Sequence, residues 1–366
     1  MFKEIILQCI SVCLIALSFF MNCSKDNPTE VTTGSISGVV IYSTNGNPAS
    51  GVVVATRPTT SSVTTDTAGH FTISNINAGN YEVIAGGINY YCNSVTVSVT
   101  ANNSSLANIE LIFFTLDWSY VPEGSFTMGS TTSDLGYYAD EMPQHAVYLD
   151  AFYICKYEIT NSQYKAFMDA GGYNNSAYWT AEGWTWCTNN NITQPEYWTS
   201  GEYNSGIAFP KCPVVGVNWY EAYAFCKWAG GRLPTEAQWE KAARHTDARF
   251  FAWGYTWDAS KCNSDNNVSP DTFGYSSPVG YFPTGASYYD TYDMTGNVWE
   301  WCNDWYDSTY YSDPSANNNP LGPTTGINRV LRGGSWGDYY GNCRTAYRIQ
   351  GPPFFRIYSY GIRPVK

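Results

Sequence analysis

Three hydropathy patterns follow one another in the first third of the chain. Residues 5–21 form a mostly apolar run that begins just after Lys3. A short basic start followed by such a run is typical of an export signal, so we expect residues 1–22 to be one. Residues 23–34 are small and polar and contain proline, which predicts a flexible tether. The first folded domain is therefore expected to begin near residue 35.

From residue 35 to about residue 114, apolar and polar positions alternate with the period of a β-strand. Gly, Asn and Pro separate the alternating segments, as they do at turns. The pattern predicts strands at 37–41, 52–55, 61–65, 70–73, 81–84 and 95–99. Strands this short and this closely spaced predict a small antiparallel β-sandwich over 35–114. His70 is interpreted as an ordinary strand residue.

Residues 115–366 show little regular periodicity. One helix is predicted from Trp219 to Ala229, after the possible cap Asn218. A second is predicted to follow Thr235, which has a capping-box spacing to Gln238. The rest consists of loops and short strands, so this part is expected to be a mixed α+β domain with much irregular structure.

The composition shows what holds such a domain together and which partners it avoids. Aromatic residues make up 17% of the chain and charged residues only 14%, so buried rings must supply much of the packing. The formal net charge is −12, which disfavours nucleic acid as a partner and favours cations. The chain has three histidines, too few to favour a zinc site.

The cysteines suggest an exported protein but do not fix a pairing. Eight cysteines remain if the signal is removed and Cys23 carries a lipid. Disulfides are compatible with export, but sequence alone cannot choose the partners. The start of the chain resembles a bacterial lipoprotein signal, with Cys23 as the lipid acceptor. This resemblance implies a lipid-anchored protein of the cell envelope, at the outer membrane or the cell surface.

Two family resemblances cover most of the chain. Residues 35–114 are similar to the carboxypeptidase regulatory-like domain, through 38–40, 48–54, 66–71 and 79–83. Residues 115–366 resemble the formylglycine-generating-enzyme, or sulfatase-modifying-factor, family. The motifs that carry this second resemblance are VPEGSFTMGS (121–130), DEMPQH (140–145), YEITN (157–161), PVVGVNW (213–219), GRLPTEAQWE (231–240), YDMTGNVWEW (292–301), LRGGSW (331–336) and GIR (361–363). The second resemblance implies a C-type lectin-like fold.

The resemblance also implies calcium, which would stiffen irregular chain through carboxylate, amide and carbonyl oxygens. The matching positions form two sets. The first set is Gly296, Asn297, Val298 and Glu300, with side-chain oxygens from Asn297 and Glu300. The second set is Asn263, Ser264, Asp271 and Phe273, with Asn263 and Asp271 as side-chain donors. The alternative is that Asn297 and Glu300 only bond nearby backbone.

Catalysis in this family is expected to need two cysteines after the Gly-Gly-Ser motif, because a thiolate pair suits Cu(I). Counted forward from Gly-Gly-Ser, the first cysteine position falls on Asp338 and the second on Cys343; counted backward from Arg344 and Arg348, the register differs and Cys343 does not match either. A carboxylate cannot replace a thiolate, which makes a copper site doubtful, and Cys343 is interpreted as a buried or disulfide-bonded residue. His145, Asp140 and Glu141 are interpreted as structural.

The arginines of the late motifs have two possible roles. Four of them could line a polar pocket or could pair with buried carboxylates. These arginines are Arg332, Arg344, Arg348 and Arg363, and the candidate carboxylates are Glu236, Glu240 and Glu300.

The C-terminal segment supports a second class of function. Aromatic and variable-looking residues are interleaved with a fixed skeleton, a pattern similar to the variable region of diversity-generating-retroelement target proteins. The predicted ligand-binding surface contains Asp338, Tyr339, Tyr340, Phe354, Phe355, Ile357, Tyr358 and Tyr360. Exposed rings provide a large, rigid contact area for a protein or other surface ligand. The sequence therefore favours an exported, non-catalytic binding protein; the alternative is a copper- and oxygen-dependent oxidase acting on protein cysteine.

Overall fold

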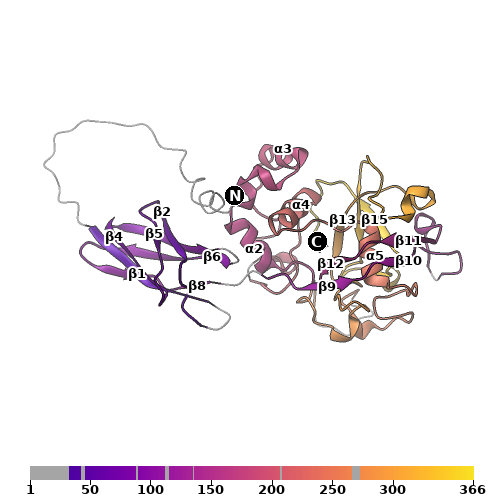
Figure 1. Ribbon diagram of the computed structural model, residues 1–366, viewed down its shortest axis with the longest axis horizontal. Coiled ribbons are helices and arrows are strands. Elements are labelled where there is room, and N and C mark those ends of the chain that lie inside the picture. The colour runs from indigo at the N-terminus through magenta and orange to yellow at the C-terminus, as the bar shows by residue number, and fades with distance from the viewer. Residues whose placement is uncertain are drawn as a thin grey trace. The chain divides into compact units, whose positions relative to one another are not determined.

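The computed structural model describes residues 33–42, 46–87, 90–111, 115–134, 136–206, 208–265 and 273–366. The chain forms two compact units: one contains the residues up to Thr115 together with Asp169–Asn174, and the other contains Leu116–Met168 and Asn175–Lys366 (Figure 1). Residues 1–32 of the predicted signal and tether, including Cys23, lie outside the described residues, whereas Thr33 and Gly34, which were predicted as tether, already belong to the first strand.

The first unit is an all-β sandwich of two sheets. Its strands are β1 (Thr33–Tyr42), β2 (Val53–Arg57), β3 (Val63–Thr64), β4 (His70–Asn77), β5 (Gly79–Gly87), β6 (Tyr90–Val99), β7 (Ser104–Leu106) and β8 (Ile109–Leu111). One sheet has the order β4-β1-β7, with β8 also paired to β1, and the other has the order β3-β2-β5-β6. The predicted strands are confirmed, but the sandwich is not wholly antiparallel, because β7 and β8 run parallel to β1.

Alternation along the strands builds the core of this sandwich. In β1 the buried side chains include Ile36 and Val40, and in β5 they include Val83 and Ala85. Because successive strand residues point to opposite faces, each sheet presents one apolar face to the other. His70 lies in β4 with an exposed side chain, as expected for an ordinary strand residue.

The second unit contains short sheets, helices and long irregular segments (Figure 1). Its strands are β9 (Trp118–Val121), β10 (Gly124–Met128), β11 (His145–Leu149), β12 (Phe152–Cys155), β13 (Trp299–Trp305), β14 (Arg329–Arg332), β15 (Arg348–Gly351) and β16 (Tyr360–Gly361). They form the pairs β10-β11 and β12-β9 and the sheet β15-β14-β13-β16. The short 3-10 helices are η1 (Ala139–Glu141), η2 (Gly172–Asn174), η3 (Ser176–Tyr178), η4 (Glu202–Asn204), η5 (Ala259–Lys261), η6 (Pro283–Gly285), η7 (Tyr310–Ser312), η8 (Pro314–Asn317) and η9 (Tyr340–Cys343).

Both predicted helices are confirmed. Helix α4 (Trp219–Trp228) begins after Asn218, which forms a capping box with Glu221. Helix α5 (Glu236–Arg244) begins after Thr235, which forms the expected capping box with Gln238. Each box satisfies backbone N–H groups that a helix start would otherwise leave unpaired.

Two further helices, α2 (Asn161–Asp169) and α3 (Ala181–Asn189), were not predicted. Helix α2 buries Tyr164, Ala166 and Phe167, and α3 buries Gly183 and Cys187. Their starts did carry a signal, because Thr160 exchanges side-chain and backbone hydrogen bonds with Gln163 and the Thr180 hydroxyl accepts from the Gly183 N–H.

The C-terminal end of the chain closes the second unit. Strand β16 pairs in parallel with β13, and Val365 then bridges to both Ile154 and Arg232. The main core of this unit packs the apolar face of α5 against strands from both ends of the domain, including β10, β11 and β14. The described residues contain no helix long and apolar enough to cross a membrane.

Candidate functional site

Asp338 is tied into the turn that follows the Gly-Gly-Ser motif. Its Oδ2 accepts hydrogen bonds from the Ser335 hydroxyl at 2.6 Å and from the Trp299 indole N–H at 2.9 Å. Its Oδ1 accepts a hydrogen bond from the Asn342 amide at 3.0 Å. Both carboxylate oxygens are therefore engaged in holding the loop.

Cys343 lies beneath that loop at the end of η9 and is completely buried. Burial raises the pKa of its thiol well above the ordinary value, with further contributions from Cys262 and Asp338. Gly334 packs so closely that a Cβ atom there would lie 2.6 Å from the Cys343 Sγ. With a carboxylate at 338 and a neutral, enclosed thiol at 343, these two positions do not fit a two-thiolate copper site.

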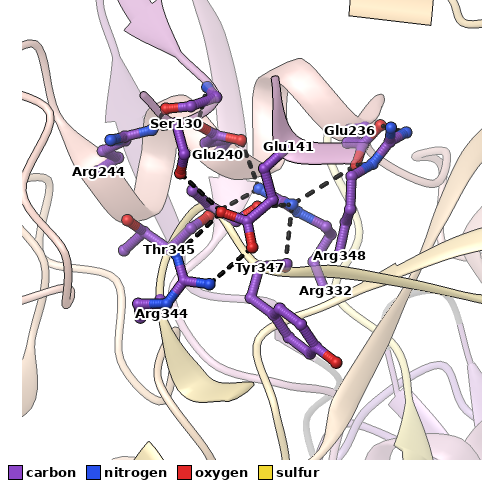
Figure 2. Close-up of polar contacts among 12 residues, drawn as sticks. Ser130, Glu141, Glu236, Glu240, Arg244, Arg332, Arg344, Thr345, Tyr347 and Arg348 are labelled. Carbon is purple, nitrogen blue, oxygen red and sulfur yellow. Dashed lines mark hydrogen bonds and ion pairs between the residues drawn. The ribbon is translucent and has the colours of Figure 1, made fainter. Parts of the chain in front are cut away.

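Four arginines in the last part of the chain each hold a glutamate through a bidentate ion pair. Arg344 holds Glu141 and Arg348 holds Glu236 (Figure 2), Arg356 holds Glu221, and Arg363 holds Glu300. The arginine–carboxylate fork fixes orientation as well as distance. The terminal segment is thereby attached to η1, α5, α4 and β13. The alternative in which these arginines pair with buried carboxylates is the observed one.

A further buried glutamate, Glu240, forms ion pairs with two more arginines (Figure 2). It accepts hydrogen bonds from Arg332 and Arg244 and from the Gly129 N–H. Burial alone would raise the pKa of Glu240, but the two guanidinium groups hold it below its ordinary value. Arg244, Arg332, Arg344, Arg348 and Arg363 are buried in this network of ion pairs, whereas Arg356 is only partly buried.

The first predicted calcium set does not fit the ion in this arrangement. Both oxygens of Glu300 accept hydrogen bonds from Arg363, and one also accepts from the Trp239 indole N–H at 2.6 Å. The Asn297 Oδ1 accepts from the Ser277 N–H and from the Asn263 amide. Calcium needs several oxygens that are not already engaged. Asn297 and Glu300 therefore bond mainly to side chains that are distant in the sequence, which differs from the alternative in which they bond only nearby backbone.

The second predicted calcium set contains oxygen atoms that are free to bind an ion within the described part of the chain. The Asn263 Oδ1 and the Ser264 Oγ are buried and have no hydrogen-bond partner among the described residues. Buried oxygens without a partner are costly unless an ion or water meets them. Asp271 lies outside the described residues, and Phe273 follows directly after that gap, with its ring 4.8 Å from that of Tyr281. The donor types present at Asn263 and Ser264 suit calcium.

Most of the predicted ligand-binding surface is exposed. The side chains of Tyr339, Tyr340, Phe354, Phe355 and Tyr358 are between 39% and 49% exposed. Two predicted members point elsewhere: Asp338 is engaged in its turn, and Tyr360 packs edge-on against Trp301 with ring centroids 5.2 Å apart. Ile357 is half-buried.

A segment that the sequence did not single out completes this surface. Residues 190–196, which follow α3, lie opposite 354–357 across a groove of about 770 Å³. Backbone hydrogen bonds from the Trp219 N–H to the Pro353 carbonyl and from the Gly216 N–H to the Ile357 carbonyl hold the segment that carries Phe354 and Phe355. No local pattern in 190–196 indicates a binding role, since its partners lie far away in the chain.

The remaining candidates have structural roles. His145 opens β11 and contacts the Tyr311 ring, Asp140 accepts a hydrogen bond from the Tyr306 hydroxyl, and Glu141 pairs with Arg344. The seven cysteines whose side chains are described are buried free thiols.

The short β-sheets, the four helices and the long ordered loops of the second unit define a C-type lectin-like domain. Residues 115–366 match the model of the sulfatase-modifying factor enzyme 1-like domain, and residues 35–112 match that of the carboxypeptidase regulatory-like domain. The chain therefore belongs to the sulfatase-modifying-factor family, with a carboxypeptidase regulatory-like domain before the family domain.

Relatives in this family include enzymes with different named activities. The chain is 36% identical to a formylglycine-generating enzyme of Streptomyces coelicolor over 270 residues, covering 64% of this chain and 83% of that enzyme. It is 34% identical to a hercynine oxygenase of Mycolicibacterium thermoresistibile, covering 65% of this chain but only 56% of that protein. Among solved structures, PvdO from Pseudomonas aeruginosa is similar with a TM-score of 0.54 and 26% identity, covering 68% of this chain and 93% of that one.

Proposed function

We propose that the C-terminal domain binds a ligand through its terminal segment and does not catalyse formylglycine formation. The proposal rests on the hydrogen bonds of Asp338 and the burial of Cys343. The carboxylate at 338 supplies hard oxygens that already hold a turn, and the thiol at 343 is enclosed in the core. Neither group offers what a Cu(I) dithiolate needs.

The anchoring of the terminal segment supports binding. Arg344, Arg348, Arg356 and Arg363 fix the backbone through ion pairs, while Phe354, Phe355 and Tyr358 between them are exposed. Rigid aromatic side chains lose little conformational entropy when a partner covers them, which is why they dominate binding surfaces. The same interleaving of fixed and exposed residues is what a diversity-generating retroelement would rewrite, and a neighbouring reverse transcriptase gene with a near-repeat of the terminal coding segment would support that origin.

The proposal extends to the location of the protein. An export signal over 1–22 and a lipid on Cys23 would attach the chain to the bacterial cell envelope, with 23–34 as a tether and the sandwich as a spacer. One or two acyl chains bury many methylenes at about 0.8 kcal/mol each, enough for durable anchoring. Calcium at the Asn263 and Ser264 oxygens would stiffen the loop beneath the binding surface.

An oxygen-dependent turnover assay tests the central claim. The full chain is loaded with Cu(I) and incubated in air with a peptide containing Cys-x-Pro-x-Arg, and formylglycine is detected by mass. The Streptomyces coelicolor enzyme serves as the positive control. We expect no conversion by the folded protein. Copper-dependent conversion that is lost in Cys343→Ser would overturn the proposal and establish the oxidase alternative.

A further inference from the structure

The groove between 190–196 and 354–357 has apolar walls. Trp186 and Ile192 contribute from the side of α3, and Phe354, Phe355 and Ile357 contribute from the terminal segment. The rings of Phe354 and Phe355 lie 5.2 Å apart and nearly perpendicular, with 49% and 45% of their side chains exposed. Such walls lose water favourably when a ligand places an apolar group between them.

The charge in the groove is negative. Arg356 lines it, but both carboxylate oxygens of Glu221 pair with this guanidinium at 2.8 and 2.9 Å, and Arg356 also donates to the Gln194 carbonyl. Glu196 is the other charged lining residue. It lies 3.9 Å from Arg356 and is 50% exposed. With Arg356 already neutralised by Glu221, the carboxylate of Glu196 is the charge that the groove presents to a ligand.

The C-terminal end of helix α3 also carries negative charge. Helix α3 ends at Asn189 on the groove side and has no basic residue in its last turn. The carbonyl groups at a helix C-terminus carry a partial negative charge of roughly half an elementary charge. Glu196 and the end of α3 therefore both favour a cation in the same groove.

We infer that this groove binds a protein segment in which a Lys or Arg side chain adjoins an aromatic or aliphatic one. This inference rests on the proposed binding function and names its ligand class. The basic side chain lies against Glu196 and the end of α3. The apolar side chain packs against the exposed sides of Phe354 and Phe355. The net charge of −12 attracts basic partners before contact.

A selection from random peptides displayed on phage tests the inference. The full-length chain is immobilised at low salt, and enriched peptides are sequenced and then synthesised for titration, with the change in tryptophan fluorescence compared between the wild type and Trp186→Phe as one readout. We expect enriched peptides to combine Lys or Arg with a neighbouring apolar residue and to be depleted in Asp and Glu. Enrichment of acidic peptides, or of none, would overturn the inference.

Single substitutions test whether the enriched peptides bind in the groove. Phe354→Ala removes one wall, and we expect it to weaken an enriched peptide by about tenfold, the usual effect of losing an aromatic anchor. Glu196→Gln should weaken binding several-fold and flatten its salt dependence, while the Glu196 backbone N–H keeps its bond to the Gly216 carbonyl. The matched control Tyr120→Ala removes a 53% exposed ring of β9 that does not line the groove, and it should leave binding unchanged.

The outcomes separate the inference from the function on which it rests. If peptides bind but lose affinity with Tyr339→Ala or Tyr340→Ala, and not with Phe354→Ala or Glu196→Gln, the domain is a binder whose site lies outside the groove. That result overturns the groove inference alone. Copper-dependent turnover in the separate assay would instead overturn the proposed function.

Discussion

Glu141 and Arg344 are 203 residues apart in the chain and form a buried bidentate ion pair, with N–O distances of 2.9 and 2.6 Å. The Ser130 hydroxyl donates to the same carboxylate at 2.6 Å. Glu141 belongs to η1 near the start of the domain, and Arg344 follows η9 near its end. This pair therefore links the two ends of the domain at a point with almost no solvent contact.

Breaking the Glu141–Arg344 pair should strongly reduce the stability of the folded protein. In Glu141→Gln the Arg344 charge stays buried with a neutral acceptor, and we expect the free energy of unfolding to fall by about 3–5 kcal/mol. Chemical denaturation of the full chain measures this loss. The double variant Glu141→Leu/Arg344→Met removes both charges and should recover much of the loss.

The matched control is a surface ion pair. Lys261→Met removes the partner of Asp258, a pair 3.7 Å apart with 29% and 44% exposed side chains, and should cost at most about 1 kcal/mol. A similar loss of unfolding free energy in Glu141→Gln and Lys261→Met would show that the buried Glu141–Arg344 pair contributes no more than a surface ion pair.

The two predicted calcium sets differ in a way that melting can detect. If calcium binds at Asn263 and Ser264, an ion concentration about one hundred times Kd adds about 2.7 kcal/mol. We expect calcium to raise the Tm of the full chain and Asn263→Ala to abolish that rise. Glu300→Gln should lower the Tm by unpairing Arg363 but keep the calcium response, and Mg²⁺ serves as the ion control. A calcium response that survives Asn263→Ala and disappears in Glu300→Gln would assign the ion to the first set instead.

Asp304 should make stability depend on pH. Burial and the nearby Glu236 carboxylate raise the pKa of Asp304, while the Glu236 N–H, Arg348 and Arg329 oppose the rise, and the net result is a pKa of about 7 compared with the ordinary 3.8. The folded protein therefore holds this proton more tightly than the unfolded chain. The stability that results is complete below about pH 4 and is lost as the pH rises through about 7, on the order of 3–4 kcal/mol.

Asp304→Asn isolates that contribution. The amide oxygen can still accept the hydrogen bond that the Glu236 N–H donates at 2.9 Å, but it carries no charge. Between about pH 5 and about pH 8 the unfolding free energy of the wild type should fall more steeply than that of the variant. Parallel pH profiles would show that Asp304 does not titrate in this range.

The capping box of α5 provides a local test. The Thr235 hydroxyl accepts from the Gln238 N–H at 3.2 Å, and the Gln238 side chain accepts from the Thr235 N–H at 3.1 Å. Thr235→Ala should cost about 1 kcal/mol in thermal or chemical unfolding, whereas Thr235→Ser should be nearly neutral. Equal losses in the two variants would indicate that packing of the Thr235 methyl group, and not its hydroxyl, is what matters.

Features specified by short stretches of sequence were predictable. Asn218 and Thr235 signalled the starts of α4 and α5, and alternation located the strands of the sandwich. The start of α2 carried the same kind of signal, since Gln163 follows Thr160 at capping-box spacing, but this spacing was not recognised. The parallel pairing of β7 with β1 was not predictable, because alternation does not reveal the direction of a neighbouring strand.

Long-range pairing limited the prediction of the site. Arg348 with Glu236, Arg332 with Glu240 and Arg363 with Glu300 could be proposed from residue type alone. The partners of Arg344 and Arg356 could not, because Glu141 was interpreted as a turn residue and Glu221 as part of a helix start. The groove wall at 190–196 was missed for the same reason: only the fold brings it opposite Phe354.

The four arginine–glutamate pairs divide the terminal segment into two kinds of position. Residues that hold the backbone are buried, and residues that display chemistry are exposed, with few contacts between the two classes. A combinatorial library that replaces Tyr339, Tyr340, Phe354, Phe355 and Tyr358 should therefore yield mostly folded members. The domain has the properties of an engineering scaffold, in which new specificities can be selected without redesigning the core.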